Sequence, residues 1–166
     1  MIESKYLQDS IQNIQQLLAI PALKKFETRQ LATLARLSKV RRYEPGECII
    51  REGDTDPWLY FLLEGSVRIT KKDVEIGTLS DVGEVFGEMR IIDSQIRSAT
   101  VVALEPTVCL AINTTAKDRM AGTGDRDEQL DFLLLLYRIF AEFLSIRLRL
   151  TNEELIKANK ILKALA

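Results

Sequence analysis

Residues 86–100 read FGEMRIIDSQIRSAT, with a Gly-Glu pair and an Arg-Ser-Ala run on either side of about two helical turns. Backbone N–H groups at the start of such a helix attract an anion. Arg97 adds a planar fork of donors suited to two phosphate oxygens, and Ser98 adds a hydroxyl. Glu88 can only accept hydrogen bonds when it is ionised, so it suits a sugar hydroxyl. The stretch predicts a nucleotide pocket, and a surface turn with a solvated arginine is the alternative that it leaves open.

The surrounding residues 39–114 have the pattern of an antiparallel β-barrel or jelly roll, also called a double-stranded β-helix. Alternating runs such as residues 67–69 and 74–76 are separated by turns, and residues 58–63 form the continuous apolar run of a central strand. Turn sequences recur about every 6 to 12 residues, which predicts an α+β protein built on this barrel. The glycines that mark the turns are Gly46, Gly53, Gly65, Gly77, Gly83 and Gly87.

Residues 1–38 are expected to form helices in front of the barrel. Apolar residues between Tyr6 and Leu18 follow a narrow helical stripe, which predicts a first helix over residues 2–20. Pro21 suits the first turn of a second helix, and Thr28 begins a third with Leu31 on its buried face.

Residues 115–166 are expected to be helical, and most of them form one long helix. Asp125 and Glu128 have the spacing of a capping box at its start. Apolar and small residues then repeat at alternating spacings of four and three, which predicts a coiled-coil seam. The second half of this helix is polar outside the seam. We therefore expect a second copy of the chain to cover the seam in a parallel homodimer. The seam, within residues 130–165, consists of Leu130, Leu134, Tyr137, Ala141, Leu144, Leu148, Thr151, Leu155, Ala158, Leu162 and Leu165.

The composition restricts the chemistry of the chain. It contains no histidine, which excludes histidine metal sites and histidine-based catalysis. Cys48 and Cys109 lie far apart in apolar runs, so we expect buried, reduced thiols, and two are too few to hold an iron–sulfur cluster. We therefore expect no enzyme activity, no catalytic residues, no metal and no cofactor.

The charge and hydropathy restrict the location and the partners. A net charge of −1 argues against a large nucleic-acid surface. The longest apolar run, residues 132–137, is far shorter than the roughly 18 residues that span a bilayer. The first residues do not resemble a secretion signal. A cytoplasmic protein that contacts neither DNA nor membrane is the expectation.

The order of these parts resembles that of the cyclic nucleotide-binding domain, and the resemblance covers about residues 23–155. The long helix is similar to the dimer helix of the catabolite activator protein branch of that family. The motifs that carry the resemblance are Pro45-Gly46-Glu47, the run YFLLEGSV at residues 60–67, GEVFGE at residues 83–88 and RSATV at residues 97–101. The resemblance implies that residues 1–166 form one sensor domain without a DNA-binding part.

The resemblance also implies which residues bind the ligand. The cyclic phosphate would contact the Arg97 and Ser98 side chains and backbone N–H groups, and Glu88 would accept the ribose 2′-hydroxyl. The base would contact Thr151 and Asn152, which replace a Thr-Ser pair in the long helix. A purely structural role for Thr151 in helix register is the alternative. The ligand-binding residues predicted in this way are Gly87, Glu88, Met89, Arg97, Ser98, Ala99, Thr151 and Asn152.

The resulting hypothesis is a homodimeric sensor in which ligand binding is coupled to the position of the long helix. The favoured ligand is cAMP, with cGMP as the alternative because Ser98 leaves the choice open. Two residues depart from the family pattern: Arg90 replaces a small residue, and Ile96 replaces a proline or polar residue. They motivate a second hypothesis, a protein-interaction module with a vestigial pocket and an unknown downstream partner. A third is the sensor half of a truncated transcription regulator like the catabolite activator protein.

Overall fold

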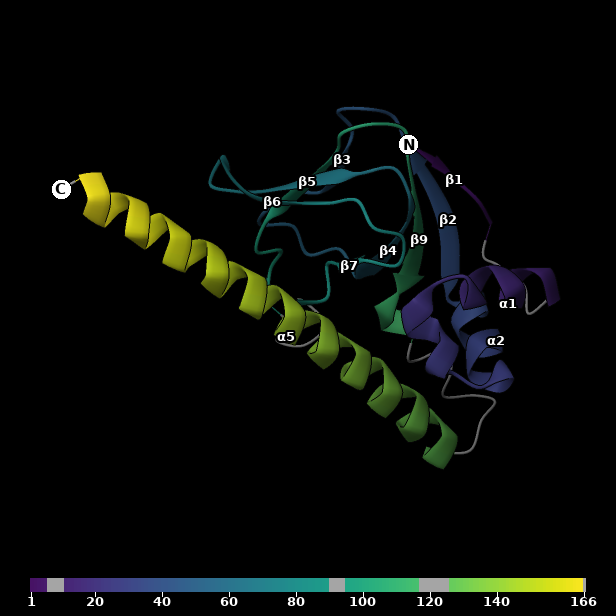
Figure 1. Cartoon of the computed structure of the whole chain (residues 1–166). Helices are drawn as coiled ribbons and strands as arrows, with labels where there is room; N and C mark the ends of the chain where they lie inside the picture. The colour runs from purple at the N-terminus through teal and green to yellow at the C-terminus, as the bar shows by residue number, and fades with distance from the viewer. Residues whose placement is uncertain (6–10, 90–94, 117–125, 166) are drawn as a thin grey trace. The chain divides into compact units, whose positions relative to one another are not determined.

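The computed structural model describes residues 1–5, 11–89, 95–116 and 126–165 of the chain. These form two compact units, Met1–Gly124 and Asp125–Ala166, and each is described by itself. Figure 1 shows the first unit as two β-sheets with short helices at one end, and the second as a single long helix, α5 (Arg126–Leu165).

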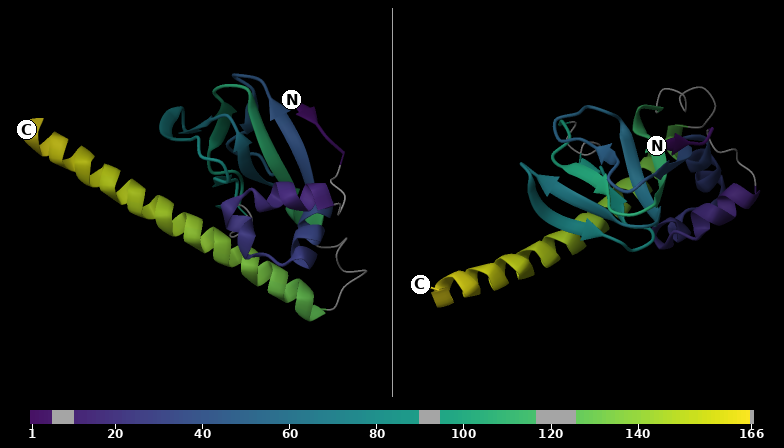
Figure 2. Two further views of the ribbon diagram at one scale, coloured as in Figure 1. Left: turned by 45° about the vertical axis from the view of Figure 1, so that its right-hand side comes forward. Right: turned by 90° about the horizontal axis from the view of Figure 1, so that it is seen from above.

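The first unit is a two-sheet antiparallel jelly roll, as the sequence predicted. Neighbouring strands within each sheet pair antiparallel, and the views in Figure 2 show the two sheets facing each other. One sheet has the order β1 (Ile2–Glu3), β2 (Ser38–Tyr43), β9 (Thr107–Asn113), β4 (Trp58–Glu64) and β7 (Val85–Phe86). The other has the order β3 (Cys48–Ile50), β8 (Thr100–Ala103), β5 (Val67–Lys71) and β6 (Val74–Leu79).

Alternation along the central strands explains the continuous apolar run of β4. Tyr60 and Leu62 belong to the core cluster, whereas Leu59 and Phe61 are buried on the other face of the same strand. Both faces of β4 are thus covered, so that nearly every position is apolar. The core cluster consists of Tyr43, Ile49, Ile50, Tyr60, Leu62, Val67, Leu79, Phe86, Val101, Ala103, Cys109 and Ala111.

The N-terminal helices differ from the prediction at their start. Residues 2–3 form strand β1 beside β2, and the first helix, α1, covers only Ile11–Leu18. An edge strand of two residues has no periodicity that a sequence pattern could reveal. The other helices are close to the expected positions: a 3-10 helix, η1, covers Pro21–Lys25, and α2 covers Thr28–Arg36 with a capping box between Glu27 and Gln30.

The last described residues of the first unit form a short helix, and the two cysteines of this unit differ in burial. The 3-10 helix η2 covers Thr114–Ala116, and the predicted capping box at Asp125 and Glu128 lies outside what the structure describes. Cys109 is buried, and burial raises the pKa of its thiol to about 12. Cys48 is exposed, so the expectation of burial was wrong for this residue, which lies on the three-residue strand β3. Both thiols are free.

The helix α5 is continuous over 40 residues, but its two halves differ in burial. Leu136, Ile139 and Phe140 are buried in the first half, and every described side chain after Arg147 is exposed. No helix within the described ranges is long and apolar enough to cross a membrane. The seam positions with exposed large apolar side chains are Leu130, Leu134, Tyr137, Leu148, Leu155, Leu162 and Leu165.

Candidate functional site

Arg97 lies just before β8 and is fixed to the turn between β3 and β4. Its backbone N–H donates to the Asp54 carbonyl at 2.8 Å, and its own carbonyl accepts the Gly53 N–H at 2.9 Å. This reciprocal pair extends the pairing of β3 and β8 to residues that precede the start of β8. These two hydrogen bonds fix the backbone of Arg97 independently of its side-chain contacts.

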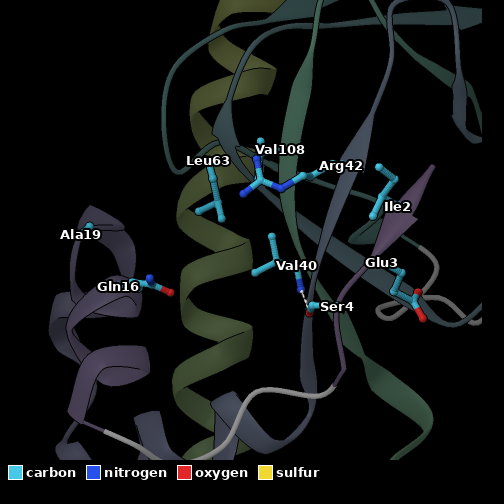
Figure 3. A pocket seen from close by; sticks show the side chains of 9 residues that line it. All are labelled: Ile2, Glu3, Ser4, Gln16, Ala19, Val40, Arg42, Leu63 and Val108. Atoms are coloured by element: carbon cyan, nitrogen blue, oxygen red, sulfur yellow. Dashed lines mark hydrogen bonds between the residues drawn. The ribbon is translucent and has the colours of Figure 1, made fainter.

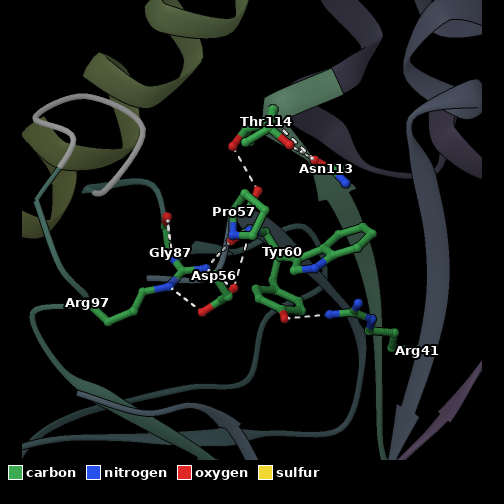
Figure 4. A network of polar contacts seen from close by, with 10 residues as sticks. Arg41, Asp56, Pro57, Tyr60, Gly87, Arg97, Asn113 and Thr114 are labelled. Carbon is green, nitrogen blue, oxygen red and sulfur yellow. Dashed lines mark hydrogen bonds and ion pairs between the residues drawn. The ribbon is translucent and has the colours of Figure 1, made fainter. Parts of the chain in front are cut away.

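The Arg97 side chain points into the first unit and is only 3% exposed. Its Nε donates to Asp56 Oδ2 at 2.9 Å and its Nη2 to Asp56 Oδ1 at 2.6 Å, a two-bond ion pair (Figure 4). Its Nη1 donates to the Gly87 carbonyl at 2.8 Å, and Nη2 also donates to the Trp58 carbonyl. Four of the five guanidinium N–H groups are engaged in these contacts.

This geometry decides how an anion could use Arg97. One Nη1 hydrogen has no acceptor among the described residues, so it can bind a phosphate oxygen without displacing anything. A second phosphate contact from the fork must replace a bond to Asp56. Burial by itself raises the pKa of the Asp56 carboxyl, but the hydrogen bonds and charge of Arg97 outweigh it and hold the pKa below its ordinary value. Asp56 is thus an ionised competitor for the position of the phosphate.

Gly87 is the residue that permits Arg97 to approach. Its φ is +80°, a conformation that side chains rarely adopt. A Cβ built there would lie 2.7 Å from Arg97 Nη1, 3.1 Å from Ile50 Cδ1 and 3.2 Å from the Trp58 carbonyl oxygen. The glycine therefore serves both the turn after β7 and the close contact of its own carbonyl with the guanidinium.

The neighbouring predicted residues lie on the same segment. Glu88 is 3% exposed, so its carboxyl group is buried directly after Gly87. Ser98 Oγ donates to Met89 Sδ at 3.4 Å, which brings the two ends of residues 86–100 together, and Ala99 follows Ser98 toward β8. The structure thus brings Gly87 and Met89 close to Arg97 and Ser98, as the nucleotide-pocket hypothesis requires.

The predicted base-contacting residues belong to the other unit. Thr151 and Asn152 lie at consecutive positions of α5, and both are exposed. Their contact with a base stays a prediction. Of the two departures from the family pattern, Ile96 is exposed directly before Arg97, and Arg90 lies outside the described residues.

Asp56 is the functional residue that the sequence reasoning missed. It stands 41 positions before Arg97, in the turn Gly53-Asp54-Thr55-Asp56-Pro57, where a solvated surface is the ordinary interpretation of an acid. A usable signal existed, because an arginine expected inside a pocket needs a carboxylate partner. Nothing in the sequence, however, distinguishes Asp56 from Asp54 for that role.

A hollow lies in the first unit away from residues 86–100. It has a volume of about 480 Å³ and lies between α1, β1 and the face of β2 that points away from the core (Figure 3). Val40, Leu63 and Val108 form its apolar floor, and Gln16 and Arg42 line its sides. None of residues 86–100 lines it, so it is separate from the nucleotide pocket proposed from the sequence.

The first unit is thus a jelly roll in which the arginine Arg97 and the glutamate Glu88 are both buried. Residues 40–122 match the family model of the cyclic nucleotide-binding domain, and this match covers half of the chain. The chain belongs to the cyclic nucleotide-binding domain family. A cGMP-dependent protein kinase of Eimeria tenella is 39% identical over 83 residues, which are 50% of this chain but 8% of the kinase.

Two solved structures extend the comparison beyond the sequence. The regulatory subunit of a cAMP-independent protein kinase A from Trypanosoma brucei is 31% identical with a TM-score of 0.57, over 61% of this chain and 38% of that one. The catabolite activator protein of Thermus thermophilus is 27% identical with a TM-score of 0.62, over 84% of this chain and 63% of that one. The chain thus covers less than two thirds of each of these relatives.

Proposed function

We propose that this chain is a sensor module that binds cAMP, with cGMP as the alternative ligand. The observation that carries the proposal is Arg97, a buried cation beside Ser98 and Gly87, with one N–H group that has no acceptor among the residues that the structure describes. A singly charged cyclic phosphate matches one such donor together with hydroxyl and backbone N–H groups. We assign the nearby buried Glu88 the role of accepting a ribose hydroxyl, which would distinguish a nucleotide from a free phosphate.

The choice between the two nucleotides rests on resemblance. Ser98 occupies the position that is often threonine in family members that bind cGMP, and the serine does not decide between the ligands. The identity with a cGMP-dependent kinase supports cGMP, and the similarity to the catabolite activator protein branch supports cAMP. We give cAMP priority and make the comparison of the two the first measurement.

We further propose that the module acts as a homodimer through α5. The large apolar side chains of the seam are exposed in the single chain, and burying them against a second copy would be favourable. Thr151 and Asn152 would then contact the base and fix the helix. Ligand binding would shift the helix equilibrium by about 1 to 3 kcal/mol, the usual size of such a coupling.

Calorimetric titration tests the ligand directly. We expect cAMP or cGMP to bind, and we expect 5′-AMP and adenosine to bind much more weakly, because they lack the cyclic phosphate. Arg97→Lys keeps the charge but loses the fork, so it should weaken binding at least tenfold. Arg68→Lys, on strand β5, is the matched control. If neither cyclic nucleotide binds at high micromolar concentration, the proposal is wrong.

One observation favours the second hypothesis, a protein-interaction module with a vestigial pocket. Asp56 forms two hydrogen bonds with Arg97, so the charge of the arginine is balanced without a ligand. The similar regulatory subunit from Trypanosoma brucei belongs to a cAMP-independent protein kinase A, which is compatible with a member of this fold that does not respond to cAMP. An unchanged melting temperature with every nucleotide, for the wild type and for Asp56→Asn, would support this hypothesis.

A further inference from the structure

A second buried arginine lies on the inner face of β2, near the nucleotide site. Arg41 Nη1 donates to the Tyr60 hydroxyl at 2.8 Å, and its guanidinium carbon lies 4.0 Å from the centre of the Trp58 ring (Figure 4). A guanidinium at this distance over an indole makes a favourable cation–π contact. Arg41 therefore packs directly on the residue whose carbonyl accepts from Arg97.

Glu3 of β1 holds Arg41 from the other side. The two residues stand opposite each other in the β1–β2 pairing, and Arg41 Nε donates to Glu3 Oε2 at 2.5 Å. Lys39 Nζ donates to the second oxygen, Oε1, at 2.6 Å. One carboxylate thus balances two cations, and opposite charges directly across a strand pair stabilise the pairing.

Trp58 joins this cluster to the phosphate-binding arginine. The indole of Trp58 faces Arg41, the backbone N–H of Trp58 donates to Asp56 Oδ1 at 3.2 Å, and its backbone carbonyl accepts from Arg97 Nη2. The same short stretch of β4 therefore contacts both arginines and the carboxylate between them. We expect a displacement of Trp58 that follows loss of the Arg41 contact to shift the backbone groups that hold Arg97 and Asp56.

We propose that Arg41, held by Glu3 of strand β1, is a positioning residue for Arg97 that acts through Trp58. The inference rests on the proposed function, because it extends the nucleotide site to β1. The strand is held by polar contacts: the Ser4 N–H donates to the Val40 carbonyl, and the Val40 N–H donates to Ser4 Oγ, both at 2.9 Å. Since both residues of β1 are exposed, little apolar burial retains it, and any partner that displaces it would change the nucleotide site.

Two mechanisms make opposite predictions for Glu3→Gln, which allows a sharp test. If Glu3 acted only through its field, removal of a negative charge would strengthen the binding of an anion. If Glu3 acts by holding Arg41 on Trp58, its removal loosens Arg97 and weakens binding. The size of a cation–π contact corresponds to a loss of about three- to tenfold in affinity for Arg41→Met, and of a similar or smaller factor for Glu3→Gln.

The experiment combines calorimetry with NMR on the full chain. Titration with cAMP and cGMP is done on the wild type, Glu3→Gln, Arg41→Met and the double variant. We expect the double variant to bind no more weakly than Arg41→Met, because Glu3 acts through Arg41. Arg42→Gln, the next residue on β2 but exposed, and Glu75→Gln, on β6, are the matched controls and should leave affinity unchanged.

The NMR readout does not need a ligand. The Arg97 Nε–H resonance is assigned by its loss in Arg97→Lys, and it should move in Glu3→Gln and Arg41→Met but not in the controls. An unmoved resonance overturns the inference whether or not a nucleotide binds. A moved resonance with unchanged or tighter binding in Glu3→Gln also overturns it. If the resonance moves but the wild type binds neither nucleotide, the proposed function fails and the dependence of Arg97 on Arg41 stands.

Discussion

Asp56 and Arg97 form a two-bond ion pair that joins the turn before β4 to the segment before β8, with Nε–Oδ2 and Nη2–Oδ1 distances of 2.9 and 2.6 Å. The arginine is almost fully buried, whereas the carboxylate side chain is 32% exposed. A bound phosphate would have to share the guanidinium with this carboxylate. The ion pair therefore stabilises the fold and at the same time lowers the affinity of Arg97 for an anion.

The first prediction concerns Asp56→Asn. Loss of the carboxylate leaves a buried cation with a weaker partner, and we expect unfolding to become easier by about 1 to 3 kcal/mol, since solvent screens the half-exposed acid. A cyclic phosphate would then supply the missing charge. Thermal melting should show a larger ligand-induced rise in Tm for Asp56→Asn than for the wild type. An equal rise in both proteins would contradict the competition between Asp56 and phosphate.

The second prediction uses two glycines with nearly the same backbone conformation. Gly87 and Gly46 have φ values of +80° and +86°, but a Cβ at Gly46 would meet nothing within 4 Å. Both substitutions by alanine carry a backbone strain of about 1 kcal/mol. Only Gly87→Ala also pushes against Arg97 Nη1. We expect nucleotide binding to be lost in Gly87→Ala and kept in Gly46→Ala, measured by calorimetry with the folded state checked by circular dichroism.

The third prediction concerns pH. The pKa of Asp56 lies below its ordinary value in the folded chain, so the unfolded chain binds a proton at Asp56 more readily. The stability that this carboxylate contributes is complete above the ordinary pKa of about 3.9 and is lost as the pH falls through the lower, folded value. In urea titrations, the difference in unfolding free energy between the wild type and Asp56→Asn should stay constant between about pH 5 and 7 and shrink below about pH 4. A difference that grows in acid would contradict the assigned ion pair.

The fourth prediction concerns the seam of α5. Leu155 lies in the seam and is 57% exposed, whereas Leu150 lies outside it and is 55% exposed. A lysine at Leu155 would place a charge in the interface of a homodimer. We expect Leu155→Lys to be monomeric and Leu150→Lys to remain dimeric in sedimentation measurements. A dimer that survives Leu155→Lys would place the contact elsewhere.

The features that the sequence could predict are those formed by residues close to one another in the chain. The glycines and alternating runs predicted the jelly roll, and the spacing of four and three predicted a long helix, which the structure has as Arg126–Leu165. The segment around Gly87 and Arg97 was also identified, because its parts lie within a few residues of one another.

What the sequence could not predict depends on pairings between distant segments. Asp56 meets Arg97 across 41 positions, and Glu3 meets Arg41 across 38. Both acids have ordinary surface residues as neighbours in the sequence. The β1–β2 register selects Glu3, and the course of the turn before β4 selects Asp56. Arg41 alternates with Arg42 on β2, and a shift of one residue would exchange the buried arginine for the exposed one.

The chain contains a single tryptophan, Trp58, and its position has a practical consequence. The tryptophan emission of the chain comes entirely from an indole that lies under the Arg41 guanidinium and belongs to the residue whose carbonyl accepts from Arg97. Emission is therefore an optical signal from the site itself, obtained without any dye. A rapid-mixing experiment can follow this signal and give the rates of ligand entry and release, which equilibrium titration does not provide.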